Sequence, residues 1–485
     1  MNWKTVFKIQ GILLIIISAS MIPPLIFSLY YNSGDTQEFL YSILISLITG
    51  LLLFLIFRSD NDLRPREGFV IVSLAWISAA LFGALPFYFY GMSEGSYIDC
   101  VFETMSGFTT TGSTILIDIE SLPKGLLFWR SETHWLGGMG IIMLTIAILP
   151  VLGLSSNTLY KAEVPGPMKD KISPRVTDTA KLLWYIYFGM TVVQSALLMF
   201  GGMSLYDSLC HTFGTLATGG FSTLNSSVAG FNNLYIEIVI MLFMYLAGIN
   251  FILHFFLLKG KFRDFFSNSE WRFYTATLVV SMIIVAADLY SRNDYSSLFA
   301  CLRYSSFQVI SITTTTGFVS ADFDKWSHFS KTILIILMFF GGCSGSTGGS
   351  IKQIRIMSVF KFSFNEIKKM IYPRSVISLK FGNDLISDTL FKNISAFFIL
   401  FISVFALSTL FLTFRGYDIV TSFSASIATL ANIGPGLSRV GAVENYAFFD
   451  GASKILLTFN MLLGRLELYS VLILIYSLFN PKKFR

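Results

Sequence analysis

Thr110-Thr111-Gly112-Ser113 is the first of four short stretches that repeat one pattern along this chain of 485 residues. The other three read Thr218-Gly219-Gly220-Phe221, Thr315-Thr316-Gly317-Phe318 and Asn432-Ile433-Gly434-Pro435. The key glycines lie about 100 to 120 residues apart, which is long enough for a structural unit to recur. Four glycine-containing loops, each flanked by membrane-length helices, predict a pore whose four walls lie in one polypeptide. A ring of backbone carbonyls can replace the hydration shell of a potassium ion.

Composition independently places the chain in a membrane. It is 54% hydrophobic and only 13% charged, whereas soluble domains carry about 25% charged residues. The four cysteines have no metal-type spacing and are expected to be buried free thiols: Cys100, Cys210, Cys301 and Cys343. The four histidines do not cluster, so neither a metal site nor a Ser/His/Asp hydrolase is indicated. We therefore predict a membrane protein that is not an enzyme and that binds no nucleic acid.

Spanning helices and shorter segments alternate along the chain. Apolar stretches of spanning length lie near 7–30, 38–57, 69–91, 125–153, 180–202, 234–258, 272–290, 328–360, 391–414 and 451–479. The segments between them begin near an acidic or tyrosyl turn, where aspartate is a good helix N-cap: Tyr97-Ile98-Asp99, Tyr206-Asp207, Asp294-Tyr295 and Tyr417-Asp418. Each is too short to span and runs into one of the four loops, so we predict that it dips into the membrane and returns.

The distribution of basic residues supports this topology. With the N-terminus in the cytoplasm and only the long helices counted as crossings, the basic segments near 58–66, 161–175, 259–272, 352–380 and 482–485 all fall inside. The predicted outer loops instead carry acidic residues, including Asp35, Asp118, Glu120 and Asp322. This is the positive-inside pattern of a multi-pass membrane protein with both termini in the cytoplasm.

The fold class that follows is an all-α membrane protein with an N-terminal helix pair and four repeats of helix, pore helix, loop and helix around a pseudo-fourfold pore. The expected boundaries are 1–58 for the helix pair, then 59–153, 154–258, 259–360 and 361–485 for the repeats. Segments 154–179 and 361–388 are expected to be cytoplasmic linkers suited to partner contact. A signal peptide ending near Ser18-Ala19-Ser20 is the alternative for the N-terminus, but the apolar run continues beyond that site.

The loops have the ingredients of a selectivity filter. Glycine permits left-handed backbone angles and close approach, threonine hydroxyls add oxygen ligands, and the C-terminal end of a pore helix directs its negative dipole at a cation. An ordinary turn is the simpler explanation of any single loop, but four aligned loops favour a filter. The predicted ion-binding residues are Thr110, Thr111, Gly112, Thr218, Gly219, Gly220, Thr315, Thr316, Gly317, Asn432, Ile433 and Gly434.

A second unusual stretch, Gly341-Gly342-Cys343-Ser344-Gly345-Ser346-Thr347-Gly348-Gly349-Ser350, interrupts the apolar segment 328–360. It lacks the lysine of a phosphate-binding loop. Tight helix packing through glycines is one explanation. We favour a broken helix, because irregular backbone is tolerated at membrane depth where it lines a cavity. The predicted gating residues in this stretch are Gly341, Gly342, Gly345, Ser346, Thr347, Gly348 and Gly349.

Arg465 lies midway along the last apolar segment, where an ionisable residue is costly and is usually functional. It can either pair with an acid such as Glu467 or reach the carbonyls of the glycine-rich stretch, and we assign it to the gate. Glu103 and His211 lie on the predicted pore helices. We expect them to be structural hydrogen-bond partners rather than ion ligands.

On the four loops, the Gly-Ser-Thr-Gly-Gly stretch and the late arginine, the whole chain resembles the Trk/Ktr/HKT superfamily of potassium translocators, and within it the bacterial Trk membrane subunits. The resemblance implies filter glycines at 112, 220, 317 and 434, an intramembrane gating loop at 341–350 and Arg465 packed against it. It also implies a homodimer in the lipid of a bacterial cytoplasmic (inner) membrane, with one pore per protomer, and a cytosolic TrkA-type regulatory subunit that carries the nucleotide-binding sites. No cofactor beyond K⁺ is implied for this chain. Relatives that admit sodium often have serine at the first filter position, so Gly112 favours potassium.

Two functional alternatives remain. A secondary transporter that couples potassium to protons or sodium would be favoured by inverted repeats and paired intramembrane acids, whereas the repeats here are parallel. A membrane enzyme that uses the glycine-rich stretch for ATP lacks a phosphate-binding lysine.

Overall fold

The computed structural model describes residues 2–57, 65–92, 96–140, 176–372, 380–381, 384–385 and 388–479. These residues form helices, apart from loops and one antiparallel pair of two-residue strands, β1 (Lys380–Phe381) and β2 (Asp384–Leu385). The predicted all-α membrane fold is therefore confirmed. The expected linker 154–179 falls almost wholly outside the described residues, as does the second half of the apolar segment 125–153.

The N-terminal unit contains α1 (Trp3–Ser20), α2 (Ile22–Tyr31) and α3 (Thr36–Ile56). Gly11 and Gly50 allow α1 and α3 to approach closely, since a Cβ at Gly11 would lie 2.6 Å from the carbonyl oxygen of Gly50. Small residues serve this purpose at helix contacts within membranes. The buried Asp35 then accepts the backbone N–H of Leu126 at 2.8 Å, which connects this unit to the start of α7.

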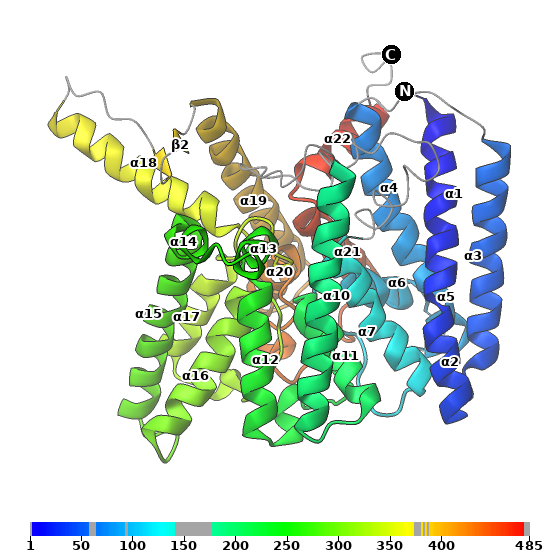
Figure 1. The fold of residues 1–485 in the computed structure, drawn as a ribbon, viewed down its shortest axis with the longest axis horizontal. Coiled ribbons are helices and arrows are strands. Elements are labelled where there is room, and N and C mark those ends of the chain that lie inside the picture. Colours follow the sequence, from blue (N-terminus) through cyan, green and yellow to red (C-terminus); the bar gives the residue numbers. More distant parts are fainter. Residues whose placement is uncertain are drawn as a thin grey trace.

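The remaining helices form four sets, each with a long helix, a short helix and a second helix (Figure 1). The first set is α4 (Pro65–Gly83), α5 (Leu85–Phe89), α6 (Tyr97–Phe108) and α7 (Lys124–Gly138). The second is α10 (Val176–Phe200), α11 (Leu205–Leu216), α12 (Leu234–Ala247) and α13 (Phe251–Leu258), followed by α14 (Phe262–Ser267). The third is α15 (Ser269–Ser291), α16 (Leu298–Thr313), α17 (His328–Met338) and α18 (Gln353–Ile371). The fourth is α19 (Asp388–Phe414), α20 (Ile419–Leu430), α21 (Gly451–Arg465) and α22 (Tyr469–Phe479). Three short 3₁₀ helices lie in the loops after the second, third and fourth short helices: η3 (Ser227–Phe231), η4 (Phe323–Lys325) and η5 (Ser438–Val440).

The short helices begin with side-chain N-caps, although in three of them the cap is not the predicted aspartate. Asp418 caps α20, as expected. Serine caps the other three at positions 96, 204 and 297, and Asp99 and Asp207 lie in the first turn instead. A serine hydroxyl caps as well as a carboxylate, and an acid in the first turn still complements the helix dipole.

The second helix of a set is broken more often than the sequence indicated. The predicted break in 328–360 separates α17 from α18. In addition, α12 and α13 meet at 102°, and α21 and α22 meet at 114°. Arg465 therefore lies at the end of α21, at a bend, and not midway along a straight span. The expected linker 361–388 also begins as helix, because α18 continues to Ile371.

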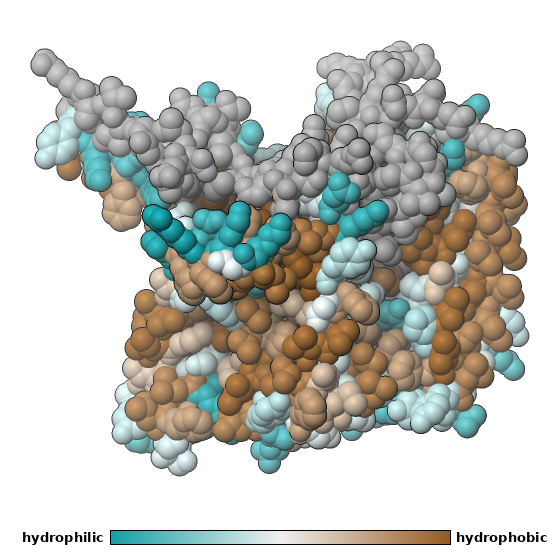
Figure 2. Space-filling model, in the orientation of Figure 1, coloured by the Kyte–Doolittle hydropathy of each residue, from teal (hydrophilic) through white to brown (hydrophobic). Residues whose placement is uncertain are grey.

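Within the described residues, six helical segments are long and apolar enough to cross a membrane, or up to eight if each bent pair is one span. A wide apolar band covers these helices, with polar residues above it and along the lower edge (Figure 2). The first residues of α1 and the last of α22 lie at the same end of the molecule (Figure 1). The four cysteines are buried free thiols, as predicted.

Candidate functional site

The four glycine loops follow the ends of α6, α11, α16 and α20 and share one backbone conformation. The residue two positions before each key glycine has a left-handed φ of 54° to 60°, at Thr110, Thr218, Thr315 and Asn432. The next backbone N–H donates to the carbonyl five residues earlier at 2.8 to 2.9 Å, in the pairs Thr111–Ser106, Gly219–Gly214, Thr316–Ser311 and Ile433–Ala428. Left-handed backbone is uncommon for threonine, so its recurrence in three loops indicates a shared structural requirement.

The key glycines close these loops into a ring. Gly112, Gly220, Gly317 and Gly434 have φ between 80° and 99°. Each key glycine packs against the carbonyl oxygen of the residue that precedes the key glycine of the next loop. A Cβ added to the glycine would lie within 2.0 to 2.6 Å of that oxygen, in the pairs Gly112–Gly219 (2.1 Å), Gly220–Thr316 (2.0 Å), Gly317–Ile433 (2.1 Å) and Gly434–Thr111 (2.6 Å). The contacts run from the first loop to the second, third and fourth and back to the first. All twelve predicted ion-binding residues therefore lie in one closed ring of backbone.

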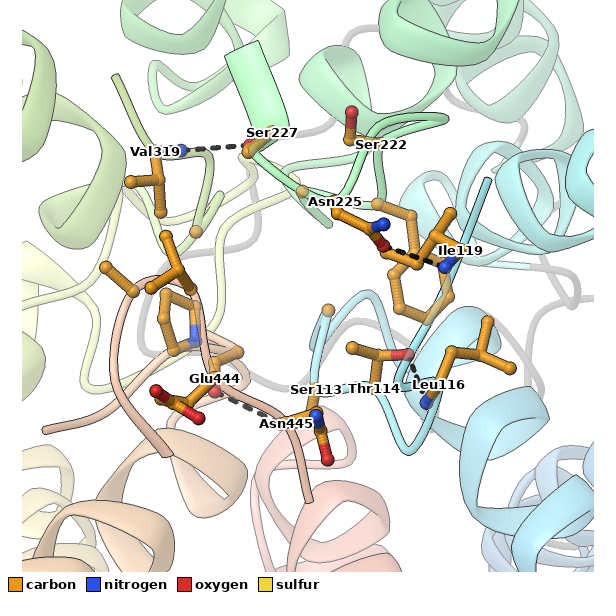
Figure 3. Close-up of a pocket in the computed structure, with 18 of the residues that line it drawn as sticks. Ser113, Thr114, Leu116, Ile119, Ser222, Asn225, Ser227, Val319, Glu444 and Asn445 are labelled. Atoms are coloured by element: carbon orange, nitrogen blue, oxygen red, sulfur yellow. Dashed lines mark hydrogen bonds between the residues drawn. The ribbon is translucent and has the colours of Figure 1, made fainter. Parts of the chain in front are cut away.

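A cavity of about 90 Å³ borders the ring, and all four key glycines line it. Figure 3 shows residues from all four sets around this cavity. Neighbouring loops are tied there by hydrogen bonds from Ile119 N to Asn225 Oδ1 at 2.7 Å and from Val319 N to Ser227 Oγ at 3.1 Å. The Asn225 amide also donates to Asp118 at 2.9 Å and thereby lowers the pKa of that carboxyl.

The fourth loop differs from the others in its side-chain contacts. The Asn432 amide donates to the Thr111 hydroxyl and to the Met461 carbonyl, both at 2.9 Å. The Gly434 carbonyl accepts the Tyr446 hydroxyl at 2.8 Å and the Ser113 hydroxyl at 3.2 Å. The ring is consequently fourfold in its backbone but not in its chemistry.

The glycine-rich stretch 341–350 leaves α17 and folds back before α18 begins. Gly341 N donates to Ile351 O at 2.9 Å, and Gln353 Nε2 donates to Gly341 O at 2.7 Å. A Cβ on Gly341 would lie 2.2 Å from the Gly349 carbonyl, so only glycine fits this crossing. The segment is a compact loop and not a continuation of the helix.

This loop contacts the ends of the pore helices beneath the ring. Gly349 N donates to Thr315 Oγ1 at 2.6 Å, and Ser350 N donates to Ala431 O at 3.0 Å. Thr347 Oγ1 donates to Leu216 O at 2.9 Å. The loop therefore bonds to the second, third and fourth sets on one side of the glycine ring.

Arg465 connects the same loop to the first set. Its guanidinium donates to Thr347 O at 2.9 Å and to Thr110 Oγ1 at 3.0 Å. It also donates to the carbonyls of Gly137 at 2.5 Å and Gly138 at 2.8 Å. The sequence left two roles for Arg465, a pair with Glu467 or a bond to the loop carbonyls, and the structure shows the second. Glu467 instead forms an ion pair with Arg355.

Several residues that hold the loop were not predicted. The Glu270 carboxylate accepts the backbone N–H of Ser344 at 2.7 Å and of Ile354 at 3.1 Å. The break between α12 and α13 exposes the Gly248 carbonyl, which accepts Cys343 N at 2.8 Å. Lys352 donates to the Gly348 carbonyl. Glu270 and Lys352 lie in or beside basic segments of the sequence, where they look like ordinary surface residues. The position of Lys352 directly after the glycine-rich stretch was the one available signal.

A ring of re-entrant loops inside a bundle of apolar helices, with a second loop beneath it, defines a membrane transport protein built from four repeats. The chain belongs to the TrkH family of cation transport proteins, whose model matches residues 35–484. This is a family of transporters and not of enzymes. The chain is 39% identical to the Trk system potassium uptake protein TrkH of Halomonas elongata, over 99% of this chain and 100% of that protein. It is 38% identical to TrkH of Escherichia coli K12, over 98% of each. The crystal structure of the potassium transporter TrkH from Vibrio parahaemolyticus covers 98% of both chains with a TM-score of 0.88 and 34% identity.

Proposed function

We propose that this chain takes up potassium across a bacterial cytoplasmic membrane through a channel-like pore, with the glycine ring as its selectivity filter. The observation that carries the proposal is the closed ring, in which each key glycine abuts the carbonyl preceding the next. Four pore helices end at this ring, so their dipoles favour a cation there. The similarity to proteins named for potassium uptake supports potassium as the ion.

The loop 341–350 is the proposed gate, with Arg465 as its latch. The loop lies beneath the proposed filter and is hydrogen-bonded to the second, third and fourth sets of helices, and Arg465 joins it to the first set. A guanidinium suits this role because it presents several donors in a fixed planar arrangement. Movement of the loop away from the filter requires these bonds to break together.

The regulator and the dimer contact are proposed to use α18. This helix projects from the bundle (Figure 1). Phe360, Phe364, Ile367, Met370 and Ile371 are all at least half exposed along it, and such a row indicates an interaction surface. A second copy of the chain and a cytosolic nucleotide-binding subunit of the TrkA type are the proposed partners. The first residues of α1 and the last residues of α22 lie at the end of the molecule that carries α18 (Figure 1), so both termini are proposed to be cytoplasmic.

The test of conduction uses the purified chain in liposomes under a potassium gradient alone. A channel-like pore gives current that reverses at the potassium equilibrium potential, with or without gradients of protons or sodium. A coupled transporter, the alternative, gives a reversal potential that moves with the gradient of the coupled ion. A current that requires a proton or sodium gradient would overturn the channel proposal.

The test of the gate compares Arg465→Ala with Arg465→Lys. The lysine variant keeps the positive charge but has a single nitrogen, which cannot replace two nitrogens bonded to four acceptors. If Arg465 is a latch, both variants raise basal potassium flux several-fold; if it acts only as a charge barrier, Arg465→Lys retains low flux. Arg415→Ala is the matched control, since Arg415 also forms an ion pair but does so with Asp450, away from the loop. Folded variants that both keep normal flux and normal regulation would refute the gate.

A further inference from the structure

A buried polar side chain lies nine residues before the key glycine on three of the four pore helices. These residues are Glu103, His211 and Gln308, and each is at most 1% exposed. Each one hydrogen-bonds to the chain two to four residues after the same glycine. The side chains differ in chemistry, so an alignment of the repeats by residue type does not reveal their common position.

In the first repeat the link is a carboxylate. Glu103 accepts the Thr114 hydroxyl at 2.9 Å and the Ile115 backbone N–H at 2.9 Å. Arg130, from α7, donates to Glu103 at 2.6 Å and to the Ser222 carbonyl at 3.0 Å. Its guanidinium also lies 3.5 Å from the centre of the Phe221 ring. This link therefore supports the first loop and continues into the second.

In the second repeat the link is an imidazole. His211 Nδ1 lies 2.8 Å from the Asp207 carbonyl and Nε2 lies 2.9 Å from the Ser222 hydroxyl. Because a carbonyl only accepts, Nδ1 carries the proton and Nε2 accepts from Ser222. Ser222 Oγ in turn accepts the Leu224 N–H at 3.1 Å.

The third and fourth repeats use neutral groups. The Gln308 amide is placed so that its oxygen faces hydrogen-bond donors and its nitrogen faces acceptors. In this orientation the oxygen accepts the backbone N–H of Ser320 at 2.9 Å and of Ala321 at 3.3 Å. The fourth pore helix has Ala425 at the equivalent position. The neighbouring Ser424 takes over the link and donates to the Leu437 carbonyl at 3.1 Å.

We propose that Glu103, His211, Gln308 and Ser424 are positioning residues for ion selection, and we call them filter struts. Each holds the outer limb of its loop at a fixed distance from its pore helix, which in turn fixes the carbonyls of the ring. The strut of the first repeat matters most, because Glu103 and Arg130 constrain two neighbouring loops at once. This inference rests on the proposed selectivity filter.

The physical basis is that the ring carbonyls can move inward around a small ion such as sodium or outward around a larger ion such as potassium. A filter that prefers the larger ion must resist contraction, and a loop bonded at both limbs resists it better than a loop bonded at one. Removal of a strut is therefore expected to admit sodium before it abolishes flux. A residue that merely stabilises the fold lowers the amount of folded protein and leaves the ion preference unchanged.

The experiment measures the reversal potential of purified protein in liposomes, with potassium on one side and sodium on the other. Glu103→Ala removes the bonds to both Thr114 and Ile115 and is expected to lower the potassium-to-sodium permeability ratio three- to tenfold. Glu103→Gln keeps an acceptor for Ile115 and is expected to give a smaller change. Gln308→Leu tests an uncharged strut and is expected to shift the ratio in the same direction.

Glu237→Gln is the matched control. Glu237 forms a partly buried ion pair with Arg303 of the pore helix α16, at 2.6 and 2.7 Å, and the contacts that the structure gives for the two side chains do not include a filter loop. Loss of this pair costs stability and is expected to leave the permeability ratio unchanged. If Glu103→Ala does not fold, Glu103→Gln and Gln308→Leu decide the question.

Three outcomes overturn the inference in distinguishable ways. If Gly112→Ser shifts the reversal potential but the folded Glu103 and Gln308 variants do not, the filter stands and the struts are structural only. If Gly112→Ser also has no effect, the filter assignment fails and the struts fail with it. If the reversal potential shifts by the same amount in the strut variants as in Glu237→Gln, the struts have no specific role in ion selection.

Discussion

Replacement of Gly112 by serine is the sharpest single test of the ring. A Cβ at this position would lie 2.1 Å from the Gly219 carbonyl oxygen, whereas real Cβ contacts are essentially never below 3.0 Å. The carbonyl must therefore move by about 1 Å, because backbone at φ 81° leaves the new side chain little freedom. One of four ring carbonyls is displaced, and a hydroxyl is added beside it.

The expected consequence is a weaker preference for potassium. Loss of about 1.4 kcal/mol of differential ion binding corresponds to a tenfold change. For scale, we take the contact between a carbonyl and an ion as comparable to a hydrogen bond to a charged group, which contributes about 1.5 to 3 kcal/mol. We therefore expect the potassium-to-sodium permeability ratio to fall about tenfold or more. The strained backbone adds a cost of about 1 to 2 kcal/mol to folding, which thermal unfolding measures separately.

Gly202→Ser separates backbone strain from the clash. Gly202 has φ 95°, and no other atom lies within 4 Å of the place that a Cβ would occupy, so serine there is strained but displaces nothing. Its permeability ratio should match that of the native protein. A folded Gly112→Ser protein with an unchanged bi-ionic reversal potential would show that residue 112 does not line the filter.

Two further predictions concern topology and the outer surface. Single cysteines at positions 169 and 369 should react with an impermeant reagent only from the cytoplasmic side, and labelling of either from outside would contradict the re-entrant loop that precedes it. Asp450→Asn should destabilise the protein by about 0.5 to 1 kcal/mol at pH 7, a modest value because the carboxyl is partly exposed. The Ser453 hydroxyl and Arg415 lower the pKa of Asp450 to about 2, so its contribution is present above its ordinary pKa and is lost as the pH falls toward 2. An equal loss of thermal stability at pH 7 and pH 2 would argue against this linkage.

The positions of the helices and the four loops were predictable because length and hydropathy are local properties. Glycine 112 and its three counterparts were found from a repeated pattern, and the break at 341–350 from its composition. The bends after α12 and α21 were not found, because Gly248-Ile249-Asn250 and Leu466-Glu467-Leu468 interrupt apolar sequence only briefly. Both bends are stabilised by tertiary contacts: the first by the bond from Cys343 N to the Gly248 carbonyl, and the second by the ion pair of Glu467 with Arg355.

The supporting residues behind the site were visible only in part: Glu103 and His211 were expected as structural hydrogen-bond partners and form such bonds, whereas Gln308, Ser424 and Arg130 were not singled out. Glu103 and Gln308 lie at equivalent places, yet a carboxylate and an amide share no sequence signal, and the fourth repeat moves the function to Ser424. Arg130 bonds to residues 27 positions before it and 92 after it, and nothing in the sequence specifies these separations. Side-chain partners over such distances are set by packing.

The differences among the four loops follow from their location in a single polypeptide. A pore built from four identical chains must use one side chain at each equivalent position, whereas this chain can vary each copy. Its fourth loop uses that freedom, since Asn432 bonds to Thr111 and the Gly434 carbonyl accepts two hydroxyls. A carbonyl that already accepts two protein donors is a weaker ligand for an ion than one without them. If the ring is the selectivity filter, as proposed, the fourth loop contributes more to closing the ring than to coordination, and we expect ion preference to depend mainly on the other three loops and their struts.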